Sequence, residues 1–136
     1  MIRKLYIQLF YHRKDVDTIG PEKKVERKIR ELISSKGGYS LKYHGSGESI
    51  AGIPDLICMY QGQTIFIEVK APNHFKLSTL QKAQMRQIRR MGGIAIATNT
   101  VEDVEDVMHF IDMKLRGKET DLEVMRCWCN EIGLDI

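Results

Sequence analysis

The strongest constraint on the fold is a pair of strand-like segments separated by a short turn. The first, residues 54–60, is rich in apolar side chains, and residues 61–63 after it have the composition of a tight turn. The second, residues 64–70, alternates between two sets of side chains, as a half-buried strand does. The two segments together predict a β-hairpin. Its second strand should direct Ile65, Ile67 and Val69 to one face and Phe66, Glu68 and Lys70 to the other.

Helical spacing and capping residues predict helices before and after this hairpin. Pro21 suits the first turn of a helix, and the glycine pair 37–38 can end it. Ser78 can cap a second helix and Thr100 a third. The expected elements in chain order are a helix from Pro21 to Lys36, a strand from Tyr39 to His44, the hairpin, a helix from Ser78 to Met91, a strand from Ile94 to Thr98 and a helix from Val101 to Leu115. On the second helix, the side chains expected to face the core are Leu77, Leu80, Gln84, Ile88 and Met91.

This order of elements predicts the α/β class, with a mixed central β-sheet flanked by helices in the order α-β-β-β-α-β-α. With 136 residues, the chain has the usual length of one domain. We expect a single domain over residues 1–136 with a core at about residues 21–112, and terminal extensions at residues 1–20 and 113–136. Alternating apolar residues at 5–11 favour a strand in the first extension. A short helix is expected in the second, around Leu122 to Trp128.

Composition argues against a membrane protein or a secreted one. The longest purely apolar run, residues 94–97, is far too short to cross a bilayer, and the first residues lack the apolar block of a signal peptide. The three cysteines, Cys58, Cys127 and Cys129, cannot all pair within one chain, so reduced thiols are expected. We therefore expect an intracellular, cytoplasmic protein that does not contact a membrane.

Charged side chains gather at one end of the predicted hairpin. Asp55 lies in its first strand, and Glu68 and Lys70 lie two residues apart on one side of its second. Two carboxylates and an ammonium group are costly to bring together unless a cation organises them, and carboxylate oxygens favour Mg²⁺ or Mn²⁺. Asp55 and Glu68 are thus candidate metal ligands, with the backbone carbonyl of Val69 as a third. Glu26, on the first helix, is a further candidate, directly or through water.

This set of groups suits the hydrolysis of a phosphodiester bond. A divalent cation lowers the pKa of its bound water and offsets the charge that develops in the transition state. Lys70 would position the attacking water or counter the charge of the scissile phosphate. The spacing alone leaves a plainer interpretation open, in which Glu68 and Lys70 form a surface pair and Asp55 is a turn residue.

A wider set of residues matches the pattern of a known nuclease family. They are Glu22, Lys24-Val25-Glu26, Gly37-Gly38, Lys42, Gly52-Ile53-Pro54-Asp55-Leu56, Phe66 to Pro72, Leu77-Ser78, Gln81 and Gly92. On these residues, which span roughly 21–112, the chain resembles the VRR-NUC (virus-type replication-repair nuclease) group of the PD-(D/E)xK nucleases. The resemblance implies a restriction-endonuclease-like fold, divalent-metal catalysis and a DNA substrate. It also implies that Glu26, Asp55 and Glu68 are metal ligands. Lys70 would be the catalytic lysine, and Gln81 the glutamine near the site.

The resemblance also bears on partners and substrate. Its likeness to the small stand-alone members of this family implies that the chain forms a homodimer. It also implies action on branched DNA, such as a four-way junction or a flap, in replication, repair or recombination. A virus-encoded protein acting inside its host cell fits this expectation. The alternative is a catalytically inactive DNA-binding module with the same fold.

Basic residues predict where DNA would bind. No acidic residue occurs from Ala71 to Val101, whereas solvated surfaces usually mix both signs. Lys82, Arg86, Arg89 and Arg90 recur at helical spacing; they form either a phosphate-binding face or a solvated one. Glycine and serine at residues 45–49 predict a flexible loop that borders the site. The full set of expected DNA-binding residues is Lys24, Lys42, His44, Lys76, Gln81, Lys82, Arg86 and Arg89.

Overall fold

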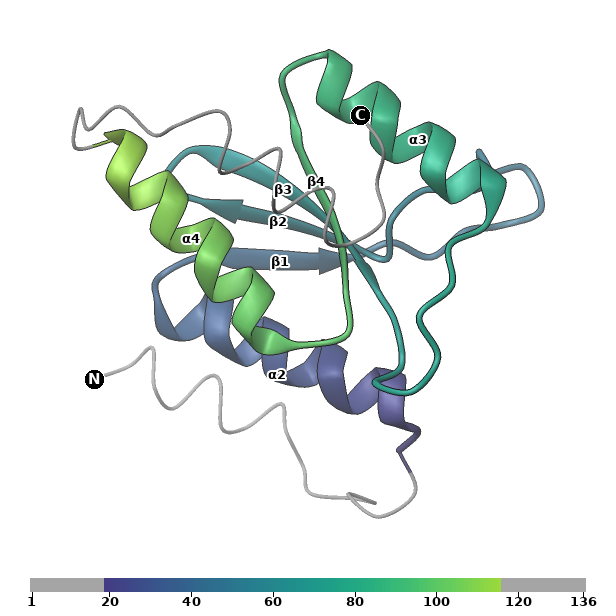
Figure 1. Cartoon of the computed structure of the whole chain (residues 1–136), viewed down its shortest axis with the longest axis horizontal. Helices are drawn as coiled ribbons and strands as arrows, with labels where there is room; N and C mark the ends of the chain where they lie inside the picture. Colours follow the sequence, from purple (N-terminus) through teal and green to yellow (C-terminus); the bar gives the residue numbers. More distant parts are fainter. Residues whose placement is uncertain (1–18, 116–136) are drawn as a thin grey trace.

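The computed structural model describes residues 19–115, and in this range the helices surround a four-stranded sheet (Figure 1). The elements are helix α2 (Pro21–Ser35), strands β1 (Tyr39–Lys42), β2 (Leu56–Tyr60) and β3 (Gln63–Val69), helix α3 (Thr79–Arg90), strand β4 (Ile94–Thr98) and helix α4 (Val101–Leu115). The strand predicted at residues 5–11 and the helix predicted at residues 122–128 lie outside the described range. Among the described helices, none has the length and apolar character needed to cross a membrane.

The sheet has the strand order β1-β2-β3-β4 and is mixed. β2 pairs antiparallel with both β1 and β3, whereas β4 runs parallel to β3. Two parallel neighbours need a crossover connection, and α3 supplies it. In Figure 1, β4 runs between α3 and α4. The predicted mixed sheet, with elements in the order α-β-β-β-α-β-α, is confirmed.

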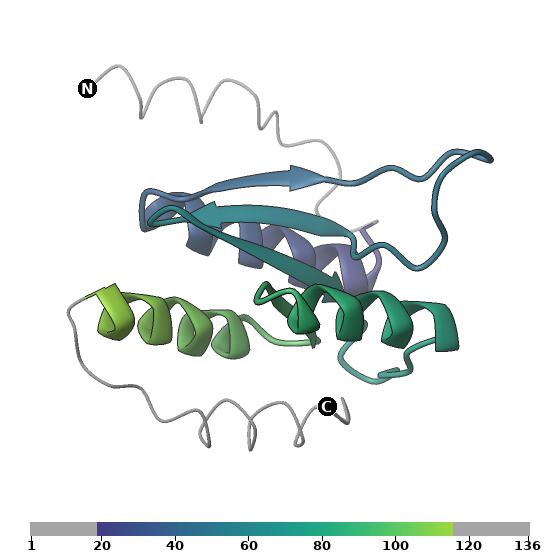
Figure 2. The same cartoon turned by 90° about the horizontal axis from the view of Figure 1, so that it is seen from above.

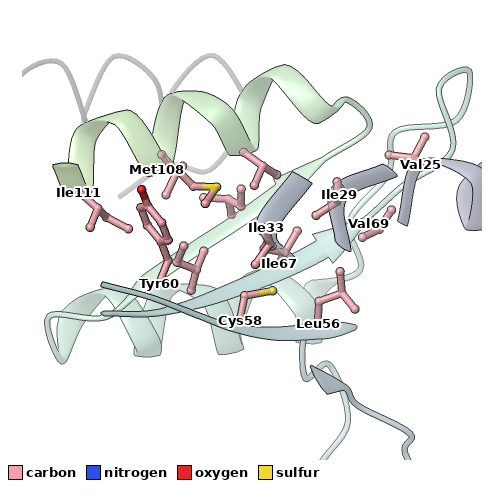
Figure 3. Close-up of a cluster of buried hydrophobic side chains, with 14 residues drawn as sticks. Val25, Ile29, Ile33, Leu56, Cys58, Tyr60, Ile67, Val69, Met108 and Ile111 are labelled. Atoms are coloured by element: carbon pink, nitrogen blue, oxygen red, sulfur yellow. The ribbon is translucent and has the colours of Figure 1, made fainter. Parts of the chain in front are cut away.

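Helices α2 and α4 cover one face of the sheet, which we call the α2–α4 face. Figure 3 shows Ile29 and Ile33 of α2 and Met108 of α4 pointing into one apolar layer above the strands. The strands contribute alternate residues to this layer, so Ile65, Ile67 and Val69 are all buried, as predicted. Tyr60 is also buried there, and its hydroxyl donates a hydrogen bond to Asp112 Oδ1 at 2.8 Å.

Helix α3 covers the opposite face, which we call the α3 face, and packs mainly against β4. The buried apolar residues of this layer are Leu77, Met85, Ala95 and Ala97, with Phe66 and Ile88 packed partly buried against them. The layer is much smaller than the one under α2 and α4.

The predicted inward face of α3 was partly wrong. Leu80 and Met91 are exposed by 56% and 78%, and Met85, which was not expected in the core, is fully buried. The reason lies at the start of the helix, where Gln81 is hydrogen-bonded to residues of the sheet. This anchor rotates the buried stripe by about one residue, to Gln81, Met85 and Ile88.

The strands are shorter than predicted at the end of the sheet that carries the charged residues. Tyr43 and His44 fall outside β1, Asp55 precedes β2, and Lys70 follows β3. Single backbone hydrogen bonds still continue the pairing: Tyr43 N donates to Asp55 O at 2.7 Å, and Lys70 N donates to Thr98 O at 2.8 Å. The charged side chains therefore sit where the regular sheet ends but the backbone is still held. Two predicted caps are present, since the Ser78 side chain caps α3 and Thr100 Oγ1 accepts from Asp103 N at the start of α4.

Candidate active site

Asp55, Glu68 and Lys70 meet at the sheet end where β2 begins and β3 ends. In the antiparallel register Leu56 pairs with Ile67, so Asp55 and Glu68 follow as the next opposed residues. The two side chains lie on the α3 face, because side chains alternate along each strand. Asp55 Oδ2 accepts a hydrogen bond from the Val69 backbone N at 3.1 Å. The fold thus brings together three of the four residues predicted to be catalytic.

Glu68 is the most enclosed of these groups, with 3% of its surface exposed. Its Oε1 accepts hydrogen bonds from Gln81 Nε2 at 2.6 Å and from Lys70 Nζ, which lies 3.2 Å away. Its other oxygen, Oε2, is buried with no hydrogen-bond partner among the described residues. A buried carboxylate oxygen normally has a partner, so this atom needs either a proton or a cation.

Gln81 connects the start of α3 to this pair. Its Oε1 accepts from Lys70 Nζ at 3.1 Å and from the Ser78 backbone N at 2.9 Å. Ser78 Oγ in turn accepts from Gln81 N at 3.1 Å, which completes a capping box. Both residues were expected near the site or at the start of the helix, but their reciprocal bonding was not predicted. The Ser-x-x-Gln spacing at residues 78–81 is the signal that would have predicted it.

Burial and mutual repulsion make it unfavourable for Asp55 and Glu68 to be ionised together. Burial and, after it, the negative charge of Asp55 raise the pKa of Glu68 to about 7, although the Lys70 ammonium acts in the opposite direction. Burial also raises the pKa of Asp55. The Val69 backbone hydrogen bond opposes that rise, whereas the charges of Glu22 and Glu26 add to it. Both carboxylates are therefore held in surroundings that favour an added positive charge.

Glu26 lies beside this cluster in an ion pair. Its Oε2 is 2.7 Å from Lys42 Nζ, and the carboxylate is largely buried. Lys42 pairs with Leu56 in the sheet and so shares the α2–α4 face, opposite to Glu68. Glu26 raises the pKa of Asp55 and Lys42 lowers it, so both charges act on Asp55. Lys42, expected to contact DNA, is here bound to a predicted metal ligand.

The residues of the site fit a divalent metal ion. Across residues 19–115, no three aspartate, glutamate, histidine or cysteine side chains converge closely enough to enclose a metal unaided. Two observations nevertheless favour a cation: Glu68 Oε2 is buried without a partner, and the pKa values of Glu68 and Asp55 are both raised. Mg²⁺ commonly uses one or two carboxylates and completes its shell with water and substrate phosphate. Asp55, Glu68 and the Val69 carbonyl would supply the protein's share.

The basic residues predicted to bind DNA do not all reach outward. Lys82 and Arg86 are partly exposed along α3, and Lys24, His44 and Lys76 are exposed. Arg89 instead folds back onto its own sheet, where its Nε donates to Ala95 O at 2.8 Å and its Nη2 donates to the same oxygen. This bond ties α3 to β4, and the contact of Arg89 with DNA stays a prediction.

A mixed α/β sheet with two carboxylates and a lysine at one end is the architecture of a nuclease-type domain. The family model of the VRR-NUC domain matches residues 6–102, and the chain therefore belongs to this family. A solved structure described as a VRR_NUC domain is similar over 67% of this chain and 97% of its own, with 24% sequence identity and a TM-score of 0.58. That likeness supports the fold. A search of curated proteins gave no match.

Proposed function

We propose that the protein is a divalent-metal-dependent nuclease that hydrolyses phosphodiester bonds in DNA. The observation that carries this proposal is Glu68 Oε2, which has no hydrogen-bond partner within residues 19–115 and is buried beside Asp55 and Lys70 in a domain of a nuclease-type family. A carboxylate oxygen in such a position is stable only with a proton or a cation, and Mg²⁺ or Mn²⁺ suits an all-oxygen set of ligands.

Each residue of the site has a distinct part in this proposal. Asp55, Glu68 and the Val69 carbonyl would hold the cation, which when bound would activate water and offset charge on the phosphate. Lys70 would direct its ammonium toward the scissile phosphate or the attacking water. The water oxygen would form a bond to phosphorus and release a proton to solvent, while the bond from phosphorus to the leaving oxygen breaks and that oxygen takes up a proton from solvent. Gln81 holds Glu68 and Lys70 at their mutual distance through its two side-chain bonds.

Glu26 acts in this scheme from outside the cluster. Its ion pair with Lys42 leaves it close enough to Asp55 to affect that residue's pKa. We assign to Glu26 the role of a ligand through water, which requires no rearrangement of the 2.7 Å ion pair. Lys42 supplies a positive partner for this largely buried side chain and also lowers the pKa of Asp55.

The substrate part of the proposal concerns DNA shape. Lys82 and Arg86 on α3, with Lys76 before it, would contact phosphates, so binding should weaken steeply with salt. We propose branched DNA, a four-way junction or a flap, as the preferred substrate. A homodimer would present two such sites to a two-fold symmetric junction. Light scattering at working concentration tests the dimer.

The experiment is a panel of labelled duplex, single-stranded, flap and four-way DNA incubated with Mg²⁺, Mn²⁺ or EDTA. Wild-type protein should cut at least one branched DNA with a divalent ion and none with EDTA. Lys70→Ala should lower the rate by about 10²-fold or more, as expected for loss of a charge at the transition state. DNA binding without cleavage under every condition would favour the inactive DNA-binding module, and cleavage that survives Lys70→Ala would remove Lys70 from the mechanism.

A further inference from the structure

Two aliphatic side chains stand exposed close to the candidate active site. Ile50, in the loop between β1 and β2, is 67% exposed, and Leu80, in the first turn of α3, is 56% exposed. Figure 2 shows this loop reaching beyond the end of the sheet on the side where α3 begins. Exposed aliphatic residues are common singly. These two stand on segments that are held together by contacts of Ala51 and Gly52 with α3.

Contacts one and two residues after Ile50 hold the loop against the first turns of α3, at Leu80 and Gln84. Gly52 has a φ of +83°, and a Cβ atom at this residue would lie 2.6 Å from the Leu80 carbonyl carbon. Only glycine permits this approach. Gln84 Nε2 also donates to Ala51 O at 3.4 Å. Ile50 and Leu80 therefore flank a fixed contact, and we call these two side chains the apolar rim.

The loop is also braced internally on the other side of Ile50. Ser46 N donates to Ser49 Oγ at 2.5 Å, and the two hydroxyls are 3.1 Å apart. Ser49 N donates to Ser46 O at 2.9 Å, which closes a turn. Ile50 thus projects from a segment that is bonded on both sides.

Each of the two segments that carry the apolar rim also carries a residue of the candidate site. Leu80 directly precedes Gln81, which bonds Glu68 and Lys70. The Ile50 loop continues into Asp55. Lys82 and Arg86 follow Leu80 along α3, and no acidic residue occurs from Ala71 to Val101. A ligand here must therefore combine negative charge, held by the basic residues, with an apolar surface for the rim.

We propose that Ile50 and Leu80 pack against an unstacked nucleobase next to the cleaved phosphate, so that the enzyme prefers DNA with unpaired or splayed bases at the cut. The inference rests on the proposed nuclease function and names the feature of the substrate that the site recognises. A nucleobase presents an apolar face within a few ångströms of a charged phosphate, the combination that this surface requires. Apolar side chains that insert between base steps must offset the energy of unstacking, which is least where bases are already unpaired.

The test compares cleavage of a flap that has unpaired bases at its branch with cleavage of a matched duplex. The double variant Ile50→Ser/Leu80→Ser should reduce the flap-to-duplex ratio of cleavage rates by about tenfold, the effect of losing the burial of one aliphatic side chain. Met91→Ser is the matched control: Met91 is 78% exposed on the same helix but lies at its far end, so the ratio should not change. Thermal unfolding of each variant checks the fold, and Ile50→Ser alone, in a loop, serves if the double variant is unstable.

A second readout follows the base directly. The same flap with 2-aminopurine at the branch is bound in EDTA, where fluorescence should rise with wild-type protein and with Met91→Ser but not with the double variant. An unchanged cleavage ratio with unchanged fluorescence would overturn the inference while leaving the nuclease proposal intact. A wild-type protein that cuts nothing but gives the rim-dependent fluorescence would overturn only the nuclease proposal. If the double variant lowers the oligomeric state without changing fluorescence, the rim is a contact between copies and the inference falls.

Discussion

The two faces of the sheet differ in the size of their apolar layers and in how completely their polar groups are paired. On the α2–α4 face, aliphatic side chains from two helices and three strands fill one continuous layer, and the few polar groups at its margin have partners, such as Tyr60 with Asp112 and Glu26 with Lys42. On the α3 face, a small apolar cluster lies beside Glu68. The Oε2 atom of Glu68 has no hydrogen-bond partner among the described residues. The same strands supply both faces, because their side chains alternate.

This difference indicates where stability and chemistry reside. The α2–α4 face removes the larger apolar area from water and so contributes most of the hydrophobic free energy of folding. Burying the Glu68 carboxylate on the α3 face lowers the free energy of unfolding. The apolar burial on the α2–α4 face offsets this loss. The predictions that follow test this division, from the largest expected effect to the smallest.

A cavity in the α2–α4 face should destabilise the protein without impairing its chemistry. Ile33→Ala removes a fully buried side chain near the end of α2 that is remote from the site, and should lower the free energy of unfolding by about 2–5 kcal/mol. The exposed Met91→Ala, on α3, should change it by less than about 0.5 kcal/mol. Urea unfolding measures both, and the cleavage rate of folded Ile33→Ala should stay near wild type. An equal effect of the two substitutions would contradict the division.

The charge of Glu68 should make the metal-free protein less stable as pH rises. The folded-state pKa of about 7 lies above the ordinary value of 4.5, so the folded protein binds the extra proton between these two values. Stability from this group is complete below pH 4.5 and is lost as pH rises through 7, by up to about 3 kcal/mol. The raised pKa of Asp55 acts in the same direction.

Glu68→Gln provides the matched control for this pH effect. The variant should lose most of the decline in unfolding free energy between pH 4.5 and 8, and it should not cut DNA. At pH 8, Mg²⁺ should raise the melting temperature of wild type but not of Glu68→Gln, because only the carboxylate gains from a bound cation. If the unfolding free energy of wild type in EDTA rises with pH through this range, the claim that ionised Glu68 destabilises the folded protein is wrong.

Loss of the α3 cap should couple a small stability change to a change in chemistry. Ser78→Ala removes the acceptor of the Gln81 backbone N–H and should cost about 1 kcal/mol of unfolding free energy. Since the same residue anchors Gln81 beside Glu68 and Lys70, cleavage should also slow at temperatures where the variant is fully folded. Ser78→Thr keeps the hydroxyl and should restore both properties. A normal cleavage rate in folded Ser78→Ala would show that the cap does not position the site.

The smallest expected effect is on the salt dependence of DNA binding, which should differ between a lysine on α3 and a lysine on α4. Lys82→Ala, on α3, should reduce the slope of log binding constant against log salt by about 1, the loss of one phosphate contact. Lys114→Ala, at an exposed position of α4, should leave the slope unchanged. Titration of fluorescent DNA at several salt concentrations measures both, and equal slopes for the two variants would place the DNA elsewhere.

Much of the fold was accessible from the sequence because it rests on local rules. Alternation in residues 64–70 predicted the two faces of β3, and the glycine pair 37–38 predicted the end of α2. The inward face of α3 was not accessible in the same way. Its apolar residues allow more than one buried stripe, and Leu80 and Met91 were wrongly placed in the core. The choice among stripes depends on Gln81, whose partners lie in another element.

The candidate site, too, was predictable from the sequence only in part. Residue types and spacing identified Asp55, Glu68 and Lys70, since a hairpin of this length must bring them near one another. Sequence could not indicate that Lys42 would pair with Glu26 or that Arg89 would bond the Ala95 carbonyl. Both basic residues are expected at DNA, and each also has a partner in another element: Glu26 of α2 for Lys42 and the Ala95 carbonyl of β4 for Arg89.

The sequence by itself determined which residues alternate, where helices begin and end, and which acids and amines share a strand, because these follow from backbone geometry within a few residues. Only the tertiary structure decided how α3 is rotated, which charges are paired, and that one oxygen of Glu68 is enclosed without a partner. Burial and electrostatic free energies depend on atoms that the folded chain brings together from distant positions, and no local pattern encodes them.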